Sequence, residues 1–378
     1  MRKFIYLALL LLLPVLVQAQ SDSLKSKLDF TGDFRFRLEQ DWDSRKADGT
    51  YRDDRTRLRY RVRFGAKYQY NSRLSFGLRL RTGQQHKQQD PQLTLGDGFN
   101  EFGTLPIGFE KIYFKSEHNG LLLWLGKNSF PFKKQNELFW SDNVYPEGVF
   151  ISKLFNFESS IFETLKLSAG HFIISTKGTS LEKDNFFRGF QIHTTHLDNK
   201  LEFFPSIYYF KNTPNIPDGN ETHLLDYSII HFGTKVKLFP KPLINFELDV
   251  YHNVENYDSN ELISDNFKKE NNGFTSAIGI GALKEKNDLL FKVTYTHMER
   301  FSAVDFLAQN DWVRWDYSSS GSPDGRLTNF KGFEITAGYV IAKKLTLKLR
   351  YYNVNQIIPY GIAKENGNRL RLDLDIGF

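Results

Sequence analysis

The chain has 378 residues, of which 40% are hydrophobic, 25% are charged and 15% are aromatic, and it contains no cysteine. Without cysteine, disulfides, thiolate metal sites and an N-terminal lipid anchor are excluded. A protein that crosses a membrane with several helices needs several apolar runs of about 20 residues, and this sequence has one long apolar run, at its N-terminus. Its 35 Phe, 18 Tyr and 5 Trp carry too much apolar surface for a disordered chain.

The first 19 residues predict a signal peptide that is removed on export. Arg2 and Lys3 precede an apolar run, and Val17-Gln18-Ala19 forms a small-residue cleavage site before Gln20. The alternative, an uncleaved membrane anchor, needs a longer apolar run. We therefore expect residues 20–378 to form one exported domain. The net charge of +6 is a mild bias, and in an exported chain it does not indicate a nucleic-acid partner.

The main structural signal is alternation of polar and apolar residues at period 2, which places successive side chains on opposite faces of a β-strand. It is clearest in residues 55–70, and no helix would separate the two sets of residues found there. One face carries Arg55, Arg57, Arg59, Arg61 and Arg63, and the other carries Leu58, Tyr60, Val62, Phe64, Ala66, Tyr68 and Tyr70.

Sixteen segments are candidate strands, and short turns alternate with long polar stretches between them. Counts of 14 or 18 stay open, because two segments, 107–118 and 186–197, are ambiguous. Strands of about 10 residues in even number, with short turns at one end and long loops at the other, are typical of an outer-membrane barrel. The predicted strands are 28–40, 54–70, 73–83, 107–118, 121–127, 148–157, 163–175, 186–197, 200–211, 225–239, 243–254, 273–283, 289–300, 330–341, 345–355 and 368–378.

We therefore predict an all-β fold, an up-and-down antiparallel β-barrel that spans a membrane. A soluble β-sandwich also alternates polar and apolar positions. A sandwich of this length would normally divide into domains, whereas no linker or composition shift interrupts this chain, and it ends on a strand whose last residue is Phe378. Because one Arg at the lipid midplane costs about 2–4 kcal/mol, the arginines of residues 55–63 must face a wet interior.

Several motifs point to a known family. The segment RLRYRVRFGAKYQYNSRLSFGLRLRTG (57–83) is followed by TLGDGF (94–99), by an Asn119-Gly120 turn within residues 109–126, by KNSFPF (127–132) and by WSDNVYPEGV (140–149). Together these residues resemble the putative porins of Gram-negative outer membranes, which are similar to the alginate-export and phosphate-selective barrels. The resemblance implies a diffusion channel in the outer membrane without a cofactor, and it names no substrate. The C-terminal LRLDLDIGF, with Phe378, looks like the signal read by the barrel-assembly machinery.

Basic residues from both ends of the chain form the predicted wall of the channel. In a closed barrel the first strands neighbour the last ones, so these residues would make one contiguous arc that favours anions, as rings of Arg and Lys do in pores. The alternative interpretation is that they only pair with carboxylates on neighbouring strands. The predicted channel-lining residues are Arg35, Arg37, Arg55, Arg57, Arg59, Arg61, Arg63, Arg79, Arg81, Lys348, Arg350, Arg369 and Arg371.

The third long loop, Asn128 to Glu147, is rich in aromatic residues. In general porins the third loop folds into the lumen and narrows it, and the resemblance implies the same here. The alternative is an external loop that is ordered by its own aromatic residues. The charged residues expected at the constriction are Lys133, Lys134, Glu137, Asp142 and Glu147.

No sequence motif indicates catalysis or a metal site. His193 and His196 are three apart on a predicted strand and therefore point to opposite faces, while Trp312, Trp315 and Tyr317 are candidates for stacking on sugars or for packing their own loop. We predict a porin, not an enzyme, that passes small hydrophilic solutes with a mild preference for anions. The alternatives are a channel selective for acidic oligosaccharide or phosphate, and a barrel with an adhesive or enzymatic role. The expected partners are outer-membrane lipid, the barrel-assembly machinery and solutes, and a homotrimer stays open.

Overall fold

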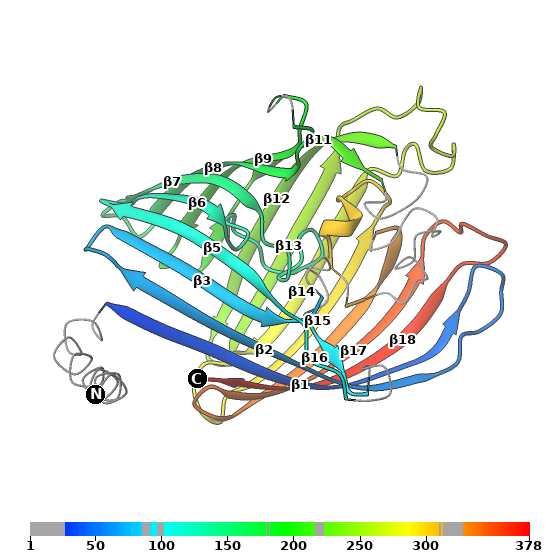
Figure 1. The fold of residues 1–378 in the computed structure, drawn as a ribbon, viewed down its shortest axis with the longest axis horizontal. Helices are drawn as coiled ribbons and strands as arrows, with labels where there is room; N and C mark the ends of the chain where they lie inside the picture. The colour runs from blue at the N-terminus through cyan, green and yellow to red at the C-terminus, as the bar shows by residue number, and fades with distance from the viewer. Residues whose placement is uncertain are drawn as a thin grey trace, which may run out of the picture.

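In the computed structural model, the described residues are 27–84, 91–96, 102–178, 180, 182–215, 223–309, 311–312 and 328–378. They form a closed antiparallel β-barrel (Figure 1). The predicted signal peptide, residues 1–19, lies outside this part of the chain, as do Trp315 and Tyr317. No helix among the described residues is both long enough and apolar enough to cross a membrane.

The described residues contain eighteen strand segments, which occupy sixteen positions in the barrel wall. β4 only adds two residues beside β2, and β10 and β11 share one position between β9 and β12. The predicted count of sixteen is confirmed. The strands are β1 (Leu28–Arg45), β2 (Arg55–Gln69), β3 (Leu74–Thr82), β4 (Leu93–Thr94), β5 (Ile107–His118), β6 (Leu121–Lys127), β7 (Glu147–Asn156), β8 (Thr164–Ser175), β9 (Asn185–His196), β10 (Leu201–Phe203), β11 (Ser206–Pro214), β12 (Leu224–Pro240), β13 (Leu243–Asn253), β14 (Asn272–Gly281), β15 (Leu289–Met298), β16 (Phe330–Ala342), β17 (Leu345–Gln356) and β18 (Asn366–Gly377).

The predicted strand 200–211 is divided between β10 and β11 at Phe204 and Pro205. Proline has no N–H to donate to a β-ladder, so it interrupts regular pairing. Phe204 is fully buried, and its ring fills the space over Gly233 of the neighbouring strand, where a Cβ would lie 1.9 Å from the ring. The interruption therefore places an aromatic side chain inside the barrel without breaking the wall.

The barrel closes where β1 pairs with β18, from Asp33 opposite Gly377 to Arg45 opposite Asn366. The last residue, Phe378, exchanges backbone hydrogen bonds with Gly32 at 3.0 and 3.2 Å. A Cβ at position 32 would lie 2.0 Å from the Phe378 ring, so only glycine leaves room for this aromatic side chain. The beginning of β1 and the end of β18 thus meet at the rim that carries the short turns (Figure 1).

Exposure along β2 separates the two faces of the wall. Leu58, Val62 and Phe64 are 42%, 36% and 43% exposed, whereas Arg59 and Arg61 are 7% and 4% exposed. The apolar residues therefore form the outer surface, and the arginines lie inside, as the period-2 pattern predicts. An outward apolar band and a polar interior are the distribution found in barrels that stand in lipid.

Connections of two lengths define the two rims. The long ones, between β1 and β2, β3 and β5, β6 and β7, and so on around the barrel, gather at one rim, and the short turns gather at the other (Figure 1). Barrels of 16 to 18 strands enclose an aqueous channel. The interior of this one is therefore wide enough to admit loop segments, and two of them enter it.

Candidate functional site

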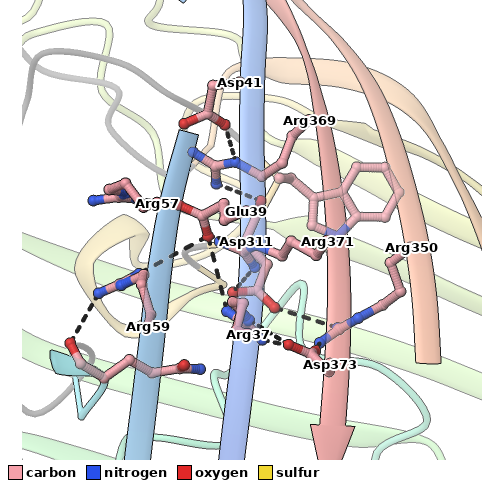
Figure 2. Close-up of polar contacts among 12 residues, drawn as sticks. Arg37, Glu39, Asp41, Arg57, Arg59, Asp311, Arg350, Arg369, Arg371 and Asp373 are labelled. Carbon is pink, nitrogen blue, oxygen red and sulfur yellow. Dashed lines mark hydrogen bonds and ion pairs between the residues drawn. The ribbon is translucent and has the colours of Figure 1, made fainter. Parts of the chain in front are cut away.

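Thirteen basic side chains predicted to line the channel are described by the structure, and they lie on five strands: β1, β2, β3, β17 and β18. We call this set the basic wall. Strand closure brings it together, because β1 has β2 on one side and β18 on the other. Figure 2 shows that arginines and carboxylates of these strands interleave, with each guanidinium beside an acidic group. The set comprises Arg35, Arg37, Arg55, Arg57, Arg59, Arg61, Arg63, Arg79, Arg81, Lys348, Arg350, Arg369 and Arg371.

Glu39 is the most connected carboxylate of this wall, and its side chain has no exposed surface. It accepts a hydrogen bond from Arg371 Nε at 2.7 Å and pairs with Arg57. Arg59 and Arg37 lie 3.9 and 4.0 Å away. Four guanidinium groups therefore surround one carboxylate, which holds β2, β1 and β18 together (Figure 2).

Six further carboxylates pair with the rest of the basic wall, mostly through charge-assisted hydrogen bonds. Asp373 binds Arg37 at 2.5 Å and Arg350 at 2.8 Å. The remaining pairs are Asp375 with Arg35 (2.5 Å) and Lys348 (3.4 Å), Asp33 with Arg61 and Arg63 (both 2.7 Å), Asp41 with Arg55 (2.7 Å) and Arg369 (2.5 Å), Glu110 with Arg79 (2.5 Å) and Arg81 (4.0 Å), and Asp311 with Arg350 (3.3 Å) and Arg371.

These pairs bear on the two interpretations of the basic residues. The sequence left open a contiguous basic arc and pairing with carboxylates on neighbouring strands, and in the structure Asp33, Glu39, Asp41, Asp373 and Asp375 lie within the wall itself. Neutralisation is nevertheless incomplete. Thirteen basic side chains share seven carboxylates, which leaves an excess of six positive charges in the network.

The third loop, residues 128–146 between β6 and β7, packs against the inner surface of the opposite wall. Phe139 stacks on Tyr251 of β13 with ring centroids 5.1 Å apart, and on Tyr208 of β11 at 4.8 Å. Phe132 packs edge-on against Tyr208 and Phe187. The aromatic residues of this loop are thus buried against the barrel wall, at 2–6% exposure for Phe132, Phe139 and Trp140.

Polar contacts fix the same loop in place. Asn136 Nδ2 donates to Asp249 Oδ2 of β13 at 2.7 Å, and Gln135 Nε2 donates to the same oxygen at 3.0 Å. The other oxygen of Asp249 lies 2.9 Å from His231 Nε2. Gln191 of β9 accepts from the Lys133 backbone N–H at 2.7 Å and donates to its carbonyl at 3.0 Å. Gln135 Nε2 also donates to the Thr234 carbonyl of β12 at 3.1 Å, so the loop is tied to three strands on the side of the lumen away from the basic wall.

The five charged residues predicted at the constriction have different positions. Lys134, Glu137 and Asp142 line a cavity between the third loop and the basic wall. Lys133 instead pairs with Glu202 at 2.7 Å. Glu147 is not a loop residue: it begins β7, is exposed, and accepts from Lys127 at 2.5 Å. Glu147 is absent from the cavity lining because it has the outward parity of Val149 and Ile151 on β7.

The cavity between the basic wall and the third loop has a volume of about 530 Å³. Its basic lining comes from both sides and consists of Arg35, Arg37, Arg61, Arg63, Lys134, Lys292, Lys348 and Arg350. Its acidic lining consists of Glu137, Asp142, Asp311 and Glu334. The lining thus carries eight basic side chains and four carboxylates, and both kinds occur on more than one side of the cavity.

Asp311 reaches the cavity from a second inward segment, residues 299–309 and 311–312, which follows β15. Phe301, Val304 and Leu307 of this segment are buried, and Trp312 packs on Tyr352 of β17 with ring centroids 5.5 Å apart. Sequence reasoning missed Asp311, because nothing distinguishes one aspartate of a long polar loop from its neighbours. Trp312 therefore packs this segment against the barrel wall, through Phe330 and Tyr352.

Two loop carboxyls in the cavity have opposite electrostatic surroundings. Burial raises the pKa of Glu137 above its usual range, and the nearby carboxylates Asp142 and Asp311 raise it further. Burial alone would also raise the pKa of Asp311, but Arg371, Arg37 and Arg350 lower it below its usual range. The lumen therefore holds one carboxylate that stays ionised and one that accepts a proton more readily than a free glutamate.

One further group has the composition of a hydrolase triad. Ser206 Oγ lies 3.3 Å from His231 Nδ1, and His231 Nε2 lies 2.9 Å from Asp249. Ser206 is only 3% exposed, its hydroxyl donates to the Phe204 carbonyl, and it accepts from Gln191. Asp249 also accepts hydrogen bonds from Gln135 and Asn136 of the third loop. The three side chains are therefore buried and help to hold this loop in place. Among the described residues no group of three or more His, Asp or Glu side chains could hold a metal ion.

Residues 46–226 match the model of a family described as putative porin. This stretch belongs to the putative porin family. The match extends the resemblance seen in the motifs of residues 57–149 and confirms it. Family and fold both point to a porin channel of the outer membrane rather than to an enzyme. No curated protein matches the chain.

Solved structures of porins are similar to this one along nearly the whole chain. A Pseudomonas putida OprB structure matches at a TM-score of 0.57 with 14% identity, covering 95% of this chain and 96% of that one. A Salmonella typhi OmpF complex with daunomycin matches at a TM-score of 0.54 with 12% identity, covering 93% and 97%. A mutant porin of Rhodopseudomonas blastica matches at 0.50 with 12% identity, covering 92% and 100%. At these identities the likeness is one of fold.

Proposed function

We propose that this protein is a passive diffusion channel for small hydrophilic solutes in the outer membrane, with a mild preference for anions. The observation that carries the proposal is the cavity of about 530 Å³ between the basic wall and the third loop, which is lined by eight basic side chains and four carboxylates. A lumen with excess positive charge concentrates anions and repels cations, and the low-dielectric wall strengthens the effect.

The ion pairs explain why the preference is mild. Each guanidinium of the basic wall that shares a carboxylate contributes only part of its charge to the field in the lumen. Opposite this wall, Glu137 and Asp142 of the third loop add negative charge. The excess of basic over acidic side chains in the lumen, and not the number of arginines, therefore sets the preference for anions over cations.

Planar-bilayer recording of the purified protein tests this function. We expect stable open-channel currents, and reversal potentials in a KCl gradient that favour Cl⁻ at low salt and approach neutrality as salt rises, because the Debye length shrinks below about 10 Å above 0.1 M. The absence of conductance would indicate an adhesive or plugged barrel. Current that saturates and is blocked by phosphate or acidic oligosaccharide would favour the second candidate, a substrate-selective channel, for which the paired arginines of the wall would provide the binding sites.

The proposal includes export and assembly. Mature protein should begin near Gln20 and float with outer-membrane lipid, with no nucleic acid bound. The molecular mass of the detergent-solubilised protein tests whether it forms a homotrimer. Deleting Phe378 should reduce insertion by the barrel-assembly machinery, since β18 would lose its contact with Gly32. Recovery of native soluble protein from the periplasm would contradict the barrel function.

A further inference from the structure

The outer surface of the barrel carries a second cavity, of about 290 Å³, which opens away from the lumen at the end of β17, β18 and β1 that bears the long loops. Four of its seven lining residues are asparagines. We call it the amide pocket. Its lining is Asp43, Tyr51, Asn353, Asn355, Asn366, Gly367 and Asn368.

Strand parity places these asparagines on the outside. On β17 the lumenal side chains are Lys348, Arg350 and the fully buried Tyr352, so the alternate residues Leu349, Tyr351 and Asn353 point outward. The outward face of β17 thus reads leucine at 345, 347 and 349, tyrosine at 351, and asparagine at 353 and 355. This order follows a path from hydrocarbon through the aromatic girdle to the headgroup level of a membrane.

The girdle below the pocket is built from Tyr351 and Trp42 of β1, whose rings stack with centroids 5.9 Å apart. The Tyr351 hydroxyl donates to Asn368 Oδ1 at 2.9 Å, and Asn353 Nδ2 donates to the same oxygen at 2.9 Å. The pocket therefore stands directly on the aromatic girdle and is joined to it by hydrogen bonds.

An irregularity in β1 creates the hollow. Register between β1 and β18 shifts between Trp42 and Arg45, and Asp43 in this bulge has a φ of 48° that turns its side chain outward. Gly367 lies opposite the bulge, where a Cβ would approach Ser44 Oγ to 2.9 Å. Bulges of this kind commonly redirect side chains at sites. Here the bulge adds a carboxylate to the amides.

The chemistry of the lining selects its ligand. An asparagine side chain has one acceptor oxygen and two N–H donors, and an aspartate has acceptors only. Asn368 Oδ1 already accepts from Tyr351 and Asn353, so this oxygen does not serve a ligand. Asp43 is the only lining residue that is charged at neutral pH, so the pocket disfavours phosphate and other anions. Tyr51 is 61% exposed and presents an aromatic face. Paired donors and acceptors beside an aromatic face match the hydroxyls and the apolar face of a neutral sugar ring. The volume of about 290 Å³ lies just below the ~300–1,000 Å³ found for ligand pockets.

We propose that the amide pocket binds a neutral sugar ring at the outer surface of the membrane. Two sources share this chemistry: the headgroup of a glycolipid of the outer leaflet, and a free saccharide. The inference goes beyond diffusion through the lumen, because the pocket lies on the other face of the wall. Asn366 is the residue that tests it best, since it contributes an amide to the lining and, in the part of the chain that the structure describes, supports no other side chain.

The test measures binding by isothermal titration of the detergent-solubilised, full-length barrel with three probes: lipopolysaccharide of the expression strain, its core oligosaccharide freed of phosphate and lipid, and inorganic phosphate. We expect binding of the core oligosaccharide, with at least tenfold loss in Asn366→Ala and in Tyr51→Ala and partial recovery in Asn366→Gln. Stronger binding of the intact glycolipid than of its core would identify the leaflet lipid as the source, and equal binding would identify a free saccharide.

Asn272→Ala is the matched control, because Asn272 is another outward-facing asparagine at the same rim, on β14. It should bind like the unchanged protein. Binding of phosphate alone, binding that is unchanged in both pocket variants, or no binding of either saccharide probe would overturn the proposal. All four variants should keep the unchanged conductance, so a failure of sugar binding is distinguishable from a failure of channel function.

Discussion

Asn136 of the third loop donates a hydrogen bond to the buried carboxylate of Asp249 on β13, with 2.7 Å between the two atoms. The same carboxylate accepts a hydrogen bond from Gln135 Nε2, and its other oxygen lies beside His231 Nε2. Hydrogen bonds to a charged group are worth about 1.5–3 kcal/mol each. The distance from the third loop to the basic wall, and with it the width of the passage, therefore depends on this attachment.

Removing both amides should release the third loop. For the double variant Gln135→Ala/Asn136→Ala we expect an altered open-channel conductance and larger current noise, because Asp249 loses two donors and only the stacking of Phe139 on Tyr251 still holds the loop to β13. Single-channel recording measures both quantities. The control is Asn143→Ala, a change in the same loop and in the same cavity lining that leaves Asp249 untouched. Equal noise in the two variants would contradict the anchoring role.

Neutralising arginines beside the cavity should weaken the anion preference. Arg61 and Arg63 share Asp33 and line the cavity. Replacing both by Gln lowers the positive excess of the basic wall by two charges, so the reversal potential in a KCl gradient should shift towards cation preference. Arg188→Gln removes an arginine that points outward from β9, and it should leave the reversal potential unchanged. A shift of the same size in both would show that surface charge, not the lumen, sets selectivity.

Glu39 should contribute more to stability than any exposed carboxylate. Its side chain is completely buried among four arginines, and removing one partner of a buried ion pair costs about 3–5 kcal/mol because the opposite charges remain. We expect Glu39→Gln to lower the midpoint of guanidinium unfolding in detergent. Glu147→Gln, which removes an exposed carboxylate from one ion pair with Lys127, should change the midpoint little. Similar midpoints for the two variants would refute this account.

Anion preference should increase as the pH falls from about 7 to 5. Burial and neighbouring carboxylates raise the pKa of Glu137, so this group gains a proton first on acidification and the cavity loses a negative charge. Asp311, whose pKa is lowered, keeps its charge in this range. The Glu137→Gln variant lacks this titratable carboxyl, so we expect it to show, at every pH tested, the stronger anion preference that the unchanged protein shows at low pH. Reversal potentials recorded between pH 7 and 5 measure the effect, and an unchanged pH profile in the variant would exclude Glu137 as its origin.

Thiol labelling should alternate along β2. Cysteine at Arg57 or Arg63 should react with water-soluble reagents in the assembled protein, because these positions face the lumen. Cysteine at Leu58 or Val62 should be shielded by lipid, since both face outward. Labelling in vesicles, compared with labelling of the same variants in denaturant, measures the difference. Uniform reactivity along the strand would mean that β2 does not span a membrane.

Much of the fold could be predicted from local pattern. Period-2 alternation decides which side chain faces which side of a strand, and it identified all sixteen positions of the wall, including the inward arginines of β2. The pattern did not predict the break between β10 and β11 at Phe204 and Pro205. Polar and apolar alternation shows which face a side chain occupies, and it does not show where a backbone hydrogen bond between strands is lost. The end of the third loop was placed at Glu147, one residue too far, because a charged residue at a strand end has no distinctive pattern.

The site depended on contacts between residues far apart in the chain. Arg37 and Asp373 both follow the alternation, yet only closure of β1 against β18 places them 2.5 Å apart. The sequence by itself determined the strands, their faces and the resemblance of residues 46–226 to the putative porins. Tertiary structure alone decided how far carboxylates neutralise the basic wall, where the third loop attaches and which loop residue, Asp311, joins the arginines. The physical reason is that electrostatic and packing energies depend on distances across the lumen, which no periodicity along the chain encodes.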